Sequence, residues 1–393
     1  MEHFLFALLI LSMTIVSIGI GIDVKQQWKY AEYDWDSKQQ MDNAVKAGIY
    51  KIRDTLLYDV DKAEDGRVFV TVPNYLGPGS PASLTTITNK KAVGGPRVHP
   101  YPDWDWHNGK SNSCDVIVNV ARIHIKCNHL FVMDNGKIGT NQLCVPKLLI
   151  FDLSNDKLVK TISIPFNIAF NETGLGILIT PVVYVPGECT RLLNEMTIFV
   201  TEPQGYGLVV YDSSTKRMCR VESDYMKSTN NNFNIAGEHF IYDGGIFSLA
   251  IAGDDLYYAA LTGNEIYKIK IKTLLECPNK EKSNDQSKLV TKLQSQAPSL
   301  AAAGQRILFY SDFEGTSILG MNLNKSGNNT VVLAQDNKKL QVISGMKYIP
   351  SSDQLIFLSN RVQRHILNTV NVDEINYRYF EMDGQEIRKK LNL

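Results

Sequence analysis

The chain has 393 residues, of which 44% are hydrophobic and 21% are charged. This composition excludes a disordered or fibrous protein and supplies enough apolar material for one large core or two modest ones. Lys+Arg and Asp+Glu both number 41, so the formal net charge is zero. Since no excess of positive charge is available to bind a phosphate backbone, we expect no nucleic-acid partner.

Residues 1–20 are dominated by an apolar run that starts with Phe4 to Leu11 and continues to Ile20. This pattern predicts a secretory signal peptide over 1–20. Glu2 and His3 stand where signal peptides usually carry Lys or Arg, so an uncleaved signal anchor is the alternative. The stretch is short for a bilayer span and has no basic flank, which favours cleavage. We therefore expect a secreted, extracellular protein with no membrane association after signal removal.

Cysteines and glycosylation sequons fit an exported protein. The six cysteines are Cys114, Cys127, Cys144, Cys189, Cys219 and Cys277. An even number after a signal segment predicts disulfides, and without a CxxC pair these spacings do not favour zinc. Sequons of the form N-x-Ser/Thr occur at Asn171, Asn324 and Asn328, and we expect N-glycans there.

A short strand-like phrase occurs six times along the chain. The copies are Val68–Thr71, Leu130–Met133, Ile198–Thr201, Leu256–Ala259, Leu308–Ser311 and Ile356–Ser359. Each is followed by a turn, and several by a second apolar run such as "LLIFDL" or "GLVVYD", which predicts hairpins. The copies are roughly 48 to 68 residues apart, a spacing typical of four-stranded propeller blades. We predict an all-β, six-bladed β-propeller in a single domain over 21–393.

Three segments outside the repeat also give predictions. The aromatic segment Trp28–Trp35 is expected to add a strand to the last blade and so close the ring. Ser37–Gly48 is the best helix candidate, and the polar segment Cys277–Ser299 is expected to be a long surface connection between blades. For Tyr101–Trp106, "YPDWDW", packing against a blade is favoured over contact with a sugar or sterol.

Aligning the six copies gives one column of residues directly after the strand core: Val72, Asp134, Glu202, Ala260, Asp312 and Asn360. If these strands are the innermost of each blade, their ends surround one mouth of the central channel. Asp134, Glu202, Asp312 and Asn360 would then bind a small polar ligand there. The alternative is that such side chains cap turns and loop N–H groups, as they often do. Both interpretations stay open at this point.

Other chemistry finds less support in the sequence. Three carboxylates and an amide could hold calcium, but no calcium-binding motif is present, so we assign no metal and no cofactor. No G-x-S-x-G elbow, no H-E-x-x-H and no complete dinucleotide loop occurs, which disfavours the corresponding enzyme classes.

Several phrases in order resemble one family: "WKYAEYDW", "YDVD", "YPDWDWHNG", "CNHLFVMDNG", "LCVPKLLIFDL", "GYGLVVYD", "GGIFSLAI" and "LIFLSNRVQ". The chain is similar to the major royal jelly protein branch of the insect yellow family, and the phrases span nearly all of it beyond the signal segment. The resemblance implies a secreted six-bladed propeller. It also implies disulfides Cys114–Cys144 and Cys127–Cys189, which leave Cys219 and Cys277 as a third pair.

The functional implications of the resemblance are broader. Relatives are tied to nutrition, to pigmentation with dopachrome conversion, and to binding of biogenic amines. Asn360 matches a ligand-contacting Asn of the amine binders, but the positions that supply a hydroxyl and an aromatic ring there fall at Gly345 and Val362. Because an ammonium group is held well by acceptors and an aromatic face, we do not expect tight amine binding.

The leading hypothesis is a non-enzymatic secreted protein that is nutritive, serves for storage, or binds a small polar or lipid ligand at the channel mouth. The alternative is a dopachrome-converting enzyme in which Asp134 or Glu202 acts as the base. A homo- or hetero-oligomer is a further expectation that one sequence leaves unspecified.

Overall fold

The structure is a computed structural model that describes residues 22–107, 114–296, 299–327 and 329–393. The predicted signal peptide and the sequon at Asn328 lie outside the described residues. Among the helices in these ranges, none combines the length and apolar character that a bilayer crossing requires.

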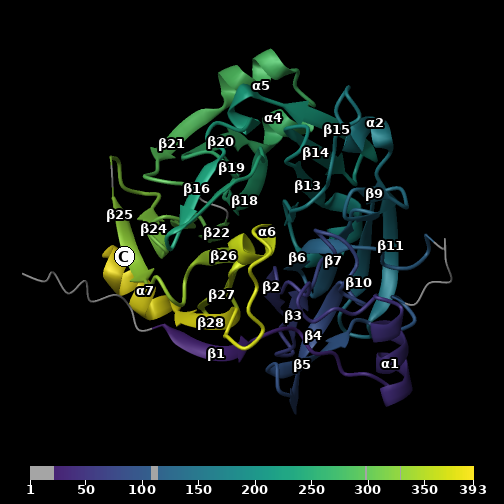
Figure 1. Ribbon diagram of the computed structural model, residues 1–393. Coiled ribbons are helices and arrows are strands. Elements are labelled where there is room, and N and C mark those ends of the chain that lie inside the picture. Colours follow the sequence, from purple (N-terminus) through teal and green to yellow (C-terminus); the bar gives the residue numbers. More distant parts are fainter. Residues whose placement is uncertain (1–21, 108–113, 297–298, 328) are drawn as a thin grey trace, which may run out of the picture.

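Six four-stranded antiparallel sheets are arranged around a central axis in the described part of the chain, as the view along that axis shows (Figure 1). The innermost strands touch one another in a closed ring. They are β2 (Val60–Lys62), β6 (Val120–Lys126), β12 (Pro181–Tyr184), β18 (Ile246–Ala252), β22 (Leu300–Ala303) and β26 (Val342–Ile349). The predicted six-bladed β-propeller is confirmed.

The second strands of the blades are β3 (Val68–Thr71), β7 (His129–Asp134), β13 (Thr197–Glu202), β19 (Asp255–Ala260), β23 (Ile307–Asp312) and β27 (Gln354–Asn360). These are the six phrases of the sequence repeat. The assumption that they are innermost is wrong, because in every blade they lie one place out from the axis. A second strand has a strand on each side and a blade against each face, and its residues are almost all buried, as in β13. Burial on both faces produces the continuous apolar runs that are easiest to recognise.

The third strands complete the predicted hairpins: β4 (Leu84–Lys91), β10 (Lys147–Asp152), β14 (Gly207–Asp212), β20 (Glu265–Lys270), β24 (Ser317–Asn322) and β28 (Tyr377–Asp383). The outer strands are β5 (Pro96–Pro100), β11 (Lys157–Ser163), β15 (Arg217–Glu222), β21 (Lys288–Lys292), β25 (Thr330–Gln335) and β1 (Asp23–Trp28). Apolar clusters between adjacent blades form the core, for example Phe199 of β13 packed with Tyr258 of β19.

The ring is closed by β1, which pairs with β28 in the last blade. The predicted closing strand was placed too late in the chain, since of Trp28–Trp35 only Trp28 belongs to β1. The rest of that segment packs on the first blade, where Trp35 stacks on Trp104 with ring centroids 4.7 Å apart. Trp28 is fully buried at the end of β1, whereas the buried Tyr33 and the half-buried Trp35 belong to the part of the segment that packs on the first blade.

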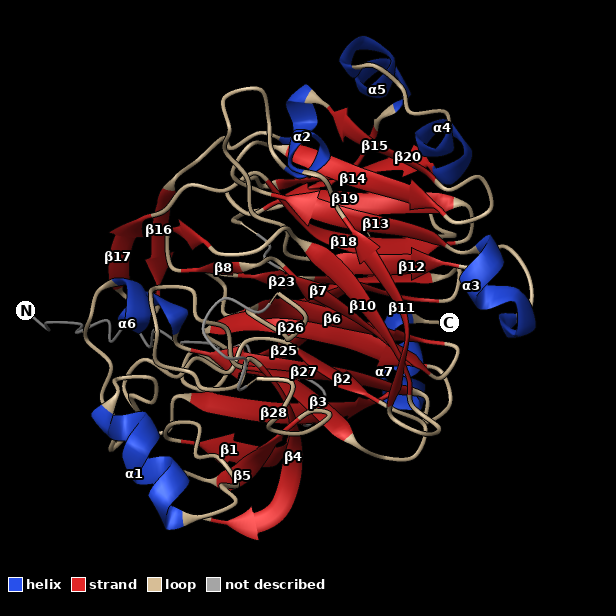
Figure 2. Ribbon diagram, turned by 90° about the vertical axis from the view of Figure 1, so that its right-hand side faces the viewer, coloured by secondary structure: helices blue, strands red, loops and turns tan. Residues whose placement is uncertain are grey.

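The helices lie outside the ring of sheets (Figure 2). They are α1 (Lys38–Lys46), α2 (Phe166–Ala169), α3 (Leu192–Glu195), α4 (Ile271–Leu275), α5 (Lys280–Gln286), α6 (Val362–Ile366) and α7 (Gly384–Leu391), with short 3-10 turns η1 (Cys189–Arg191) and η2 (Asp224–Met226). The helix predicted over Ser37–Gly48 is α1, capped by the Ser37 side chain. The segment Cys277–Ser299 is more than a connection, because it contains α5 and the outer strand β21.

Two small hairpins lie at the end of the ring that carries α6: β8 (Lys137–Ile138) with β9 (Asn141–Gln142), and β16 (Asn232–Ile235) with β17 (Glu238–Ile241). The turn of the second hairpin places Ala236 and Gly237 at φ values of 51° and 87°, the conformation that a tight two-residue hairpin loop requires. An ion pair of 3.2 Å between Arg364 of α6 and Glu238 of β17 ties this hairpin to the last blade.

Candidate functional site

The carboxylate of Asp134, at the end of β7, is fully buried. It accepts backbone hydrogen bonds from Val118 and Asn119, ahead of the innermost strand, and from Gly136 in the following turn, at 3.0, 2.9 and 3.0 Å. Lys147 Nζ lies 3.6 Å away. Burial raises the pKa of Asp134, and these N–H groups and Lys147 oppose that effect. The side chain holds its blade together from within.

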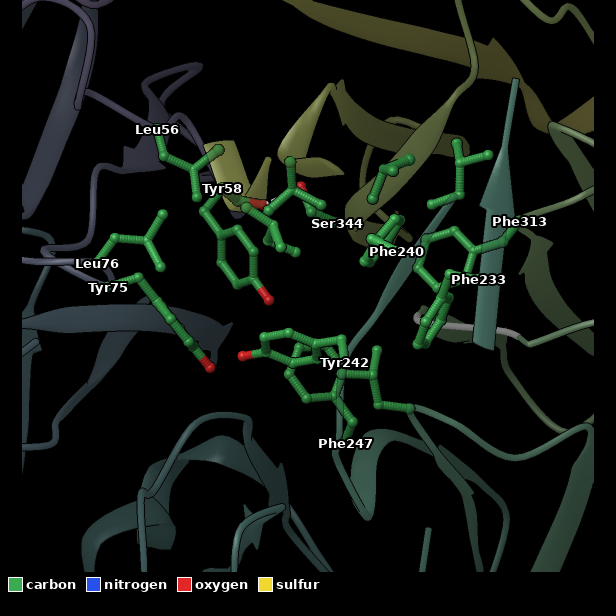
Figure 3. A pocket seen from close by; sticks show the side chains of 15 residues that line it. Leu56, Tyr58, Tyr75, Leu76, Phe233, Phe240, Tyr242, Phe247, Phe313 and Ser344 are labelled. Carbon is green, nitrogen blue, oxygen red and sulfur yellow. Dashed lines mark hydrogen bonds between the residues drawn. The ribbon is translucent and has the colours of Figure 1, made fainter. Parts of the chain in front are cut away.

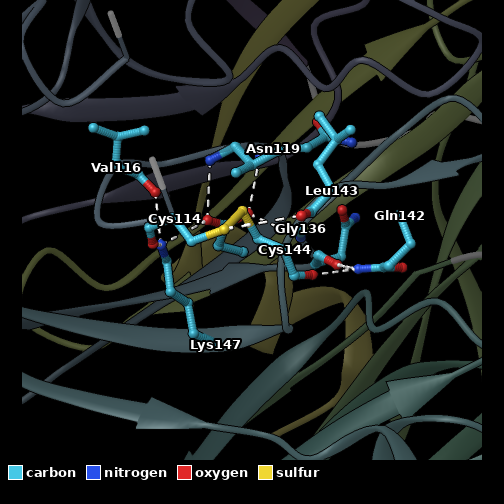
Figure 4. The surroundings of a disulfide bond; sticks show 11 residues. Cys114, Val116, Asn119, Gly136, Gln142, Leu143, Cys144 and Lys147 are labelled. Atoms are coloured by element: carbon cyan, nitrogen blue, oxygen red, sulfur yellow. Dashed lines mark hydrogen bonds and ion pairs between the residues drawn. A yellow bond between two sulfur atoms is a disulfide. The ribbon is translucent and has the colours of Figure 1, made fainter. Parts of the chain in front are cut away.

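The disulfide Cys114–Cys144 lies next to these contacts of Asp134 (Figure 4). Lys147 Nζ donates to the carbonyl groups of Cys114 and Val116, which anchors the disulfide loop beside Asp134. The other bridges are Cys127–Cys189 and Cys219–Cys277. All three pairs are those that the family resemblance implies.

Glu202, at the end of β13, repeats the arrangement in the third blade. Its buried carboxylate accepts N–H groups of Ile177, Gln204 and Gly205 at 2.9, 2.8 and 2.7 Å. Arg220 Nη2 donates to the same carboxylate at 2.9 Å. Burial raises the pKa of Glu202, against the opposing influence of Ile177 N–H and of Arg220. The lone pairs that a ligand would need are thus occupied by the blade itself.

Asp312 is half-buried, accepts from Gly315 N at 3.1 Å and binds the Ser295 hydroxyl. Asn360 joins the last blade to the first, because its Nδ2 donates to Leu57 O at 3.1 Å and to Ser344 Oγ at 2.8 Å. Its Oδ1 accepts from the N–H of the second residue after it at 3.1 Å. In all four positions the observed contacts are the structural ones.

A pocket does exist at the mouth of the channel, but other residues form it (Figure 3). Its volume is about 60 Å³, and it opens to solvent. The lining comes from blades one, four, five and six and from the hairpin β16–β17: Leu56, Tyr58, Tyr75, Leu76, Phe233, Ile235, Phe240, Tyr242, Phe247, Leu261, Phe313, Val342, Ser344, Val362 and Ile366. Asp134, Glu202, Asp312 and Asn360 are not part of this lining.

Sequence reasoning missed these residues because they lie outside the six repeated phrases: at the start of innermost strands or just before them, after second strands, on α6 and in the β16–β17 insertion. The phrases "YDVD" and "GGIFSLAI" contain Tyr58 and Phe247, so the signal was present without a role attached. Val362 lines the pocket as an aliphatic residue. At Gly345 a Cβ would lie 2.4 Å from Asp59 Oδ1, so no hydroxyl side chain fits there. The neighbouring Ser344 lines the pocket, but its Oγ is bonded to the Tyr58 carbonyl and to Asn360 Nδ2.

Two buried carboxyl groups and a lysine connect innermost strands of neighbouring blades. Lys347 Nζ lies 2.9 and 3.1 Å from the two carboxylate oxygens of Asp59, and Asp59 Oδ2 accepts from Ile123 N at 3.0 Å. The nearby Asp61 accepts from Ile125 N at 2.7 Å. These contacts join the innermost strands of blades six, one and two. Burial raises the pKa of Asp61 to about 7, although Lys347 opposes the shift. Among the described residues, no group of three or more His, Cys, Asp or Glu side chains is arranged to hold a metal ion.

The raised pKa of Asp61 predicts a loss of stability as pH rises. The unfolded carboxyl ionises near pH 4 while the folded one keeps its proton to about pH 7, so folding is favoured at low pH and this advantage disappears between these values. We expect the wild type to lose up to about 4 kcal/mol more between pH 4 and pH 8 than Asp61→Asn. Urea denaturation across that range measures it, and parallel pH profiles for the two proteins would contradict it.

Comparisons with known proteins identify one family. The family model described as "Major royal jelly protein" matches residues 118–391. Major royal jelly protein 6 of Apis mellifera is 31% identical, with 91% of this chain and 84% of the relative covered. Major royal jelly protein 3 of the same species is 32% identical, with 92% and 69% covered.

Among solved structures, virginiamycin B lyase from Staphylococcus aureus is 13% identical, covers 84% of this chain and 95% of that chain, and has a TM-score of 0.43. Similarity at this level carries no information on activity. The match over residues 118–391 and the near full-length relatives show that this chain belongs to the major royal jelly protein family.

Proposed function

We propose that this protein is a secreted, non-enzymatic binding protein that holds a small, largely apolar ligand in the pocket at the channel mouth, in a nutritive or storage setting. The observation that carries the proposal is the pocket itself. Aromatic and aliphatic side chains from four blades and an inserted hairpin converge on one opening, and such concave apolar sites with a few polar atoms are the usual form of small-molecule sites.

The proposal moves the binding site away from the carboxylates that the repeat singled out and replaces a polar ligand by a mainly apolar one. Secretion is supported by the three disulfides, because such bonds persist in oxidising compartments. The sequon residue Asn324 is exposed, which suits a glycan.

Dopachrome conversion remains the second candidate from the sequence, and no particular contact favours it. A base must lie within hydrogen-bond reach of its substrate. Asp134 and Glu202 are fully buried, their oxygens are bound to backbone N–H groups, and neither lines the pocket. We therefore do not extend the proposal to that reaction.

Filling the pocket should abolish binding. Val362 lies on α6 and lines the opening, whereas Leu367, at the end of the same helix, is 38% exposed and lies outside the lining. We expect Val362→Trp to lose binding of the neutral apolar probe N-phenyl-1-naphthylamine and Leu367→Trp to keep it, as measured by fluorescence titration. Equal binding by both variants would place the apolar site elsewhere.

A further inference from the structure

The polar atoms of the pocket gather at one end of it. The hydroxyl groups of Tyr58, Tyr75 and Tyr242 point toward one another there (Figure 3). Ser344 is less available, since its Oγ contacts the Tyr58 carbonyl and accepts from Asn360. None of the described lining residues is acidic or basic. This end therefore offers hydroxyl protons and no carboxylate.

A positive charge lies directly behind this wall. Arg122, on β6, is 4% exposed, and its guanidinium carbon lies 4.4 Å from the Phe247 ring centroid and 5.8 Å from that of Tyr58. One of its nitrogens donates to Ser344 O. The charge of Arg122 lowers the pKa of the Tyr58 hydroxyl, although burial raises it overall. The guanidinium is thus electrostatically coupled to the polar end of the pocket.

The nearby carboxylate Asp59 does not reverse the sign of this field, because Lys347 is paired with both of its oxygens. Asp243 follows Tyr242 and is exposed, and it accepts a hydrogen bond from Tyr206 at 2.9 Å. Water screens an exposed charge of this kind far more than it screens Arg122.

An amine would therefore bind poorly. An ammonium group would be partly desolvated near Arg122, with no carboxylate among the described residues of the lining to pair with it. One ring face of Phe247 is already covered by a cation, so its use for a second cation–π contact is opposed by like-charge repulsion. A carboxylate would instead meet hydroxyl donors and a positive potential.

We infer that the pocket selects ligands with a carboxylate or similar anionic acceptor at one end of an aromatic body, and discriminates against the corresponding amines. This inference rests on the proposed function, since it names the class of ligand for the same pocket. Arg122 acts in it as the residue that sets charge preference, with Tyr58 and Tyr242 as the contacting donors.

Three compounds with one shared body test the inference: 3-phenylpropionate, 3-phenyl-1-propanol and 3-phenylpropylamine. Isothermal titration calorimetry at pH 7 should show the carboxylate binding at least about tenfold more tightly than the amine, with the alcohol between them. The Arg122→Met variant should reduce that ratio to less than about threefold, and Arg122→Lys should retain the preference for the anion.

Three further variants separate site assignment from folding. Arg53 lines a neighbouring cavity of about 250 Å³ that shares Leu56, Tyr75 and Leu76 with the pocket, so Arg53→Met removes a nearby cation outside the site and should leave the ratio unchanged. If Arg122→Met does not fold, as judged by its melting transition, the single variants Tyr58→Phe and Tyr242→Phe take its place. Each should weaken binding of the carboxylate several-fold and leave binding of the amine unchanged.

Each outcome bears on one claim. Tightest binding by the amine, equal affinities in the wild type, or loss of the preference in Arg53→Met would overturn the inference about Arg122. In those cases, sensitivity of all three compounds to Val362→Trp would leave the proposed binding function intact. Failure of all three compounds and of the neutral probe to bind would overturn the proposed function as well.

Discussion

Replacing Glu202 by alanine is expected to lower the free energy of unfolding by roughly 3 to 5 kcal/mol. Its carboxylate is fully buried and accepts three backbone N–H groups as well as Arg220. Truncation removes this partner from Arg220, whose side chain is 9% exposed. It also leaves the three backbone N–H donors without their acceptor. Urea denaturation at pH 7, with the disulfides intact, gives the difference.

A matched control uses another glutamate–arginine pair. Glu195 contacts Arg191 at 2.6 Å on the surface of the protein, where the arginine side chain is 71% exposed. We expect Glu195→Ala to cost at most about 1 kcal/mol. If Glu202→Ala lowered the free energy of unfolding no more than this control does, the carboxylate would not be holding the blade together. That result would favour a ligand-binding role for the column residues.

The second large effect is expected at the closure of the ring. Trp28 is fully buried at the end of β1, pairs with Tyr377 of β28 in the last blade, and donates its indole N–H to Pro96 O of the first blade at 2.7 Å. Trp28→Ala should lower the free energy of unfolding by roughly 3 to 5 kcal/mol, because it leaves a cavity between the first and last blades.

Trp28→Phe separates packing from the hydrogen bond. It keeps an aromatic ring at this position and removes the donor to Pro96, so we expect a loss of roughly 1 to 2 kcal/mol. Equilibrium denaturation of both variants measures the effect. Unfolding free energies within about 0.5 kcal/mol of wild type for Trp28→Ala would mean that β1 is not needed to close the ring.

The blade number could be predicted from the sequence because the second strands are buried on both faces. Runs such as Ile198–Thr201 have three consecutive apolar residues and are buried at every position, and six of them at comparable spacing identify six blades. The radial position of these strands could not be read in the same way. Innermost strands such as β2 and β22 are short, and β22 is mostly alanine beyond Leu300, so the sequence pattern emphasised the wrong strand of each blade.

The candidate site could not be predicted from the sequence, because a repeat pattern reports what the blades share. Column residues such as Asp134 and Glu202 are polar because they accept N–H groups of their own loops, a structural need shared by the four blades that carry a polar residue at this position. A ligand pocket in a propeller is formed once, by positions that differ among the blades. Tyr242 directly follows the β16–β17 hairpin, which is inserted between the third and fourth blades. Ser344 lines the pocket because of its position on β26, and no sequence pattern indicates that position.

The most direct test of the central claim, that the pocket at the channel mouth holds a ligand, is native mass spectrometry of the protein recovered from a secreting insect cell line. We predict that the wild type and Leu367→Trp carry an additional small-molecule mass that Val362→Trp lacks. The same small-molecule mass on Val362→Trp, or its absence from the wild type and both variants, would contradict the account.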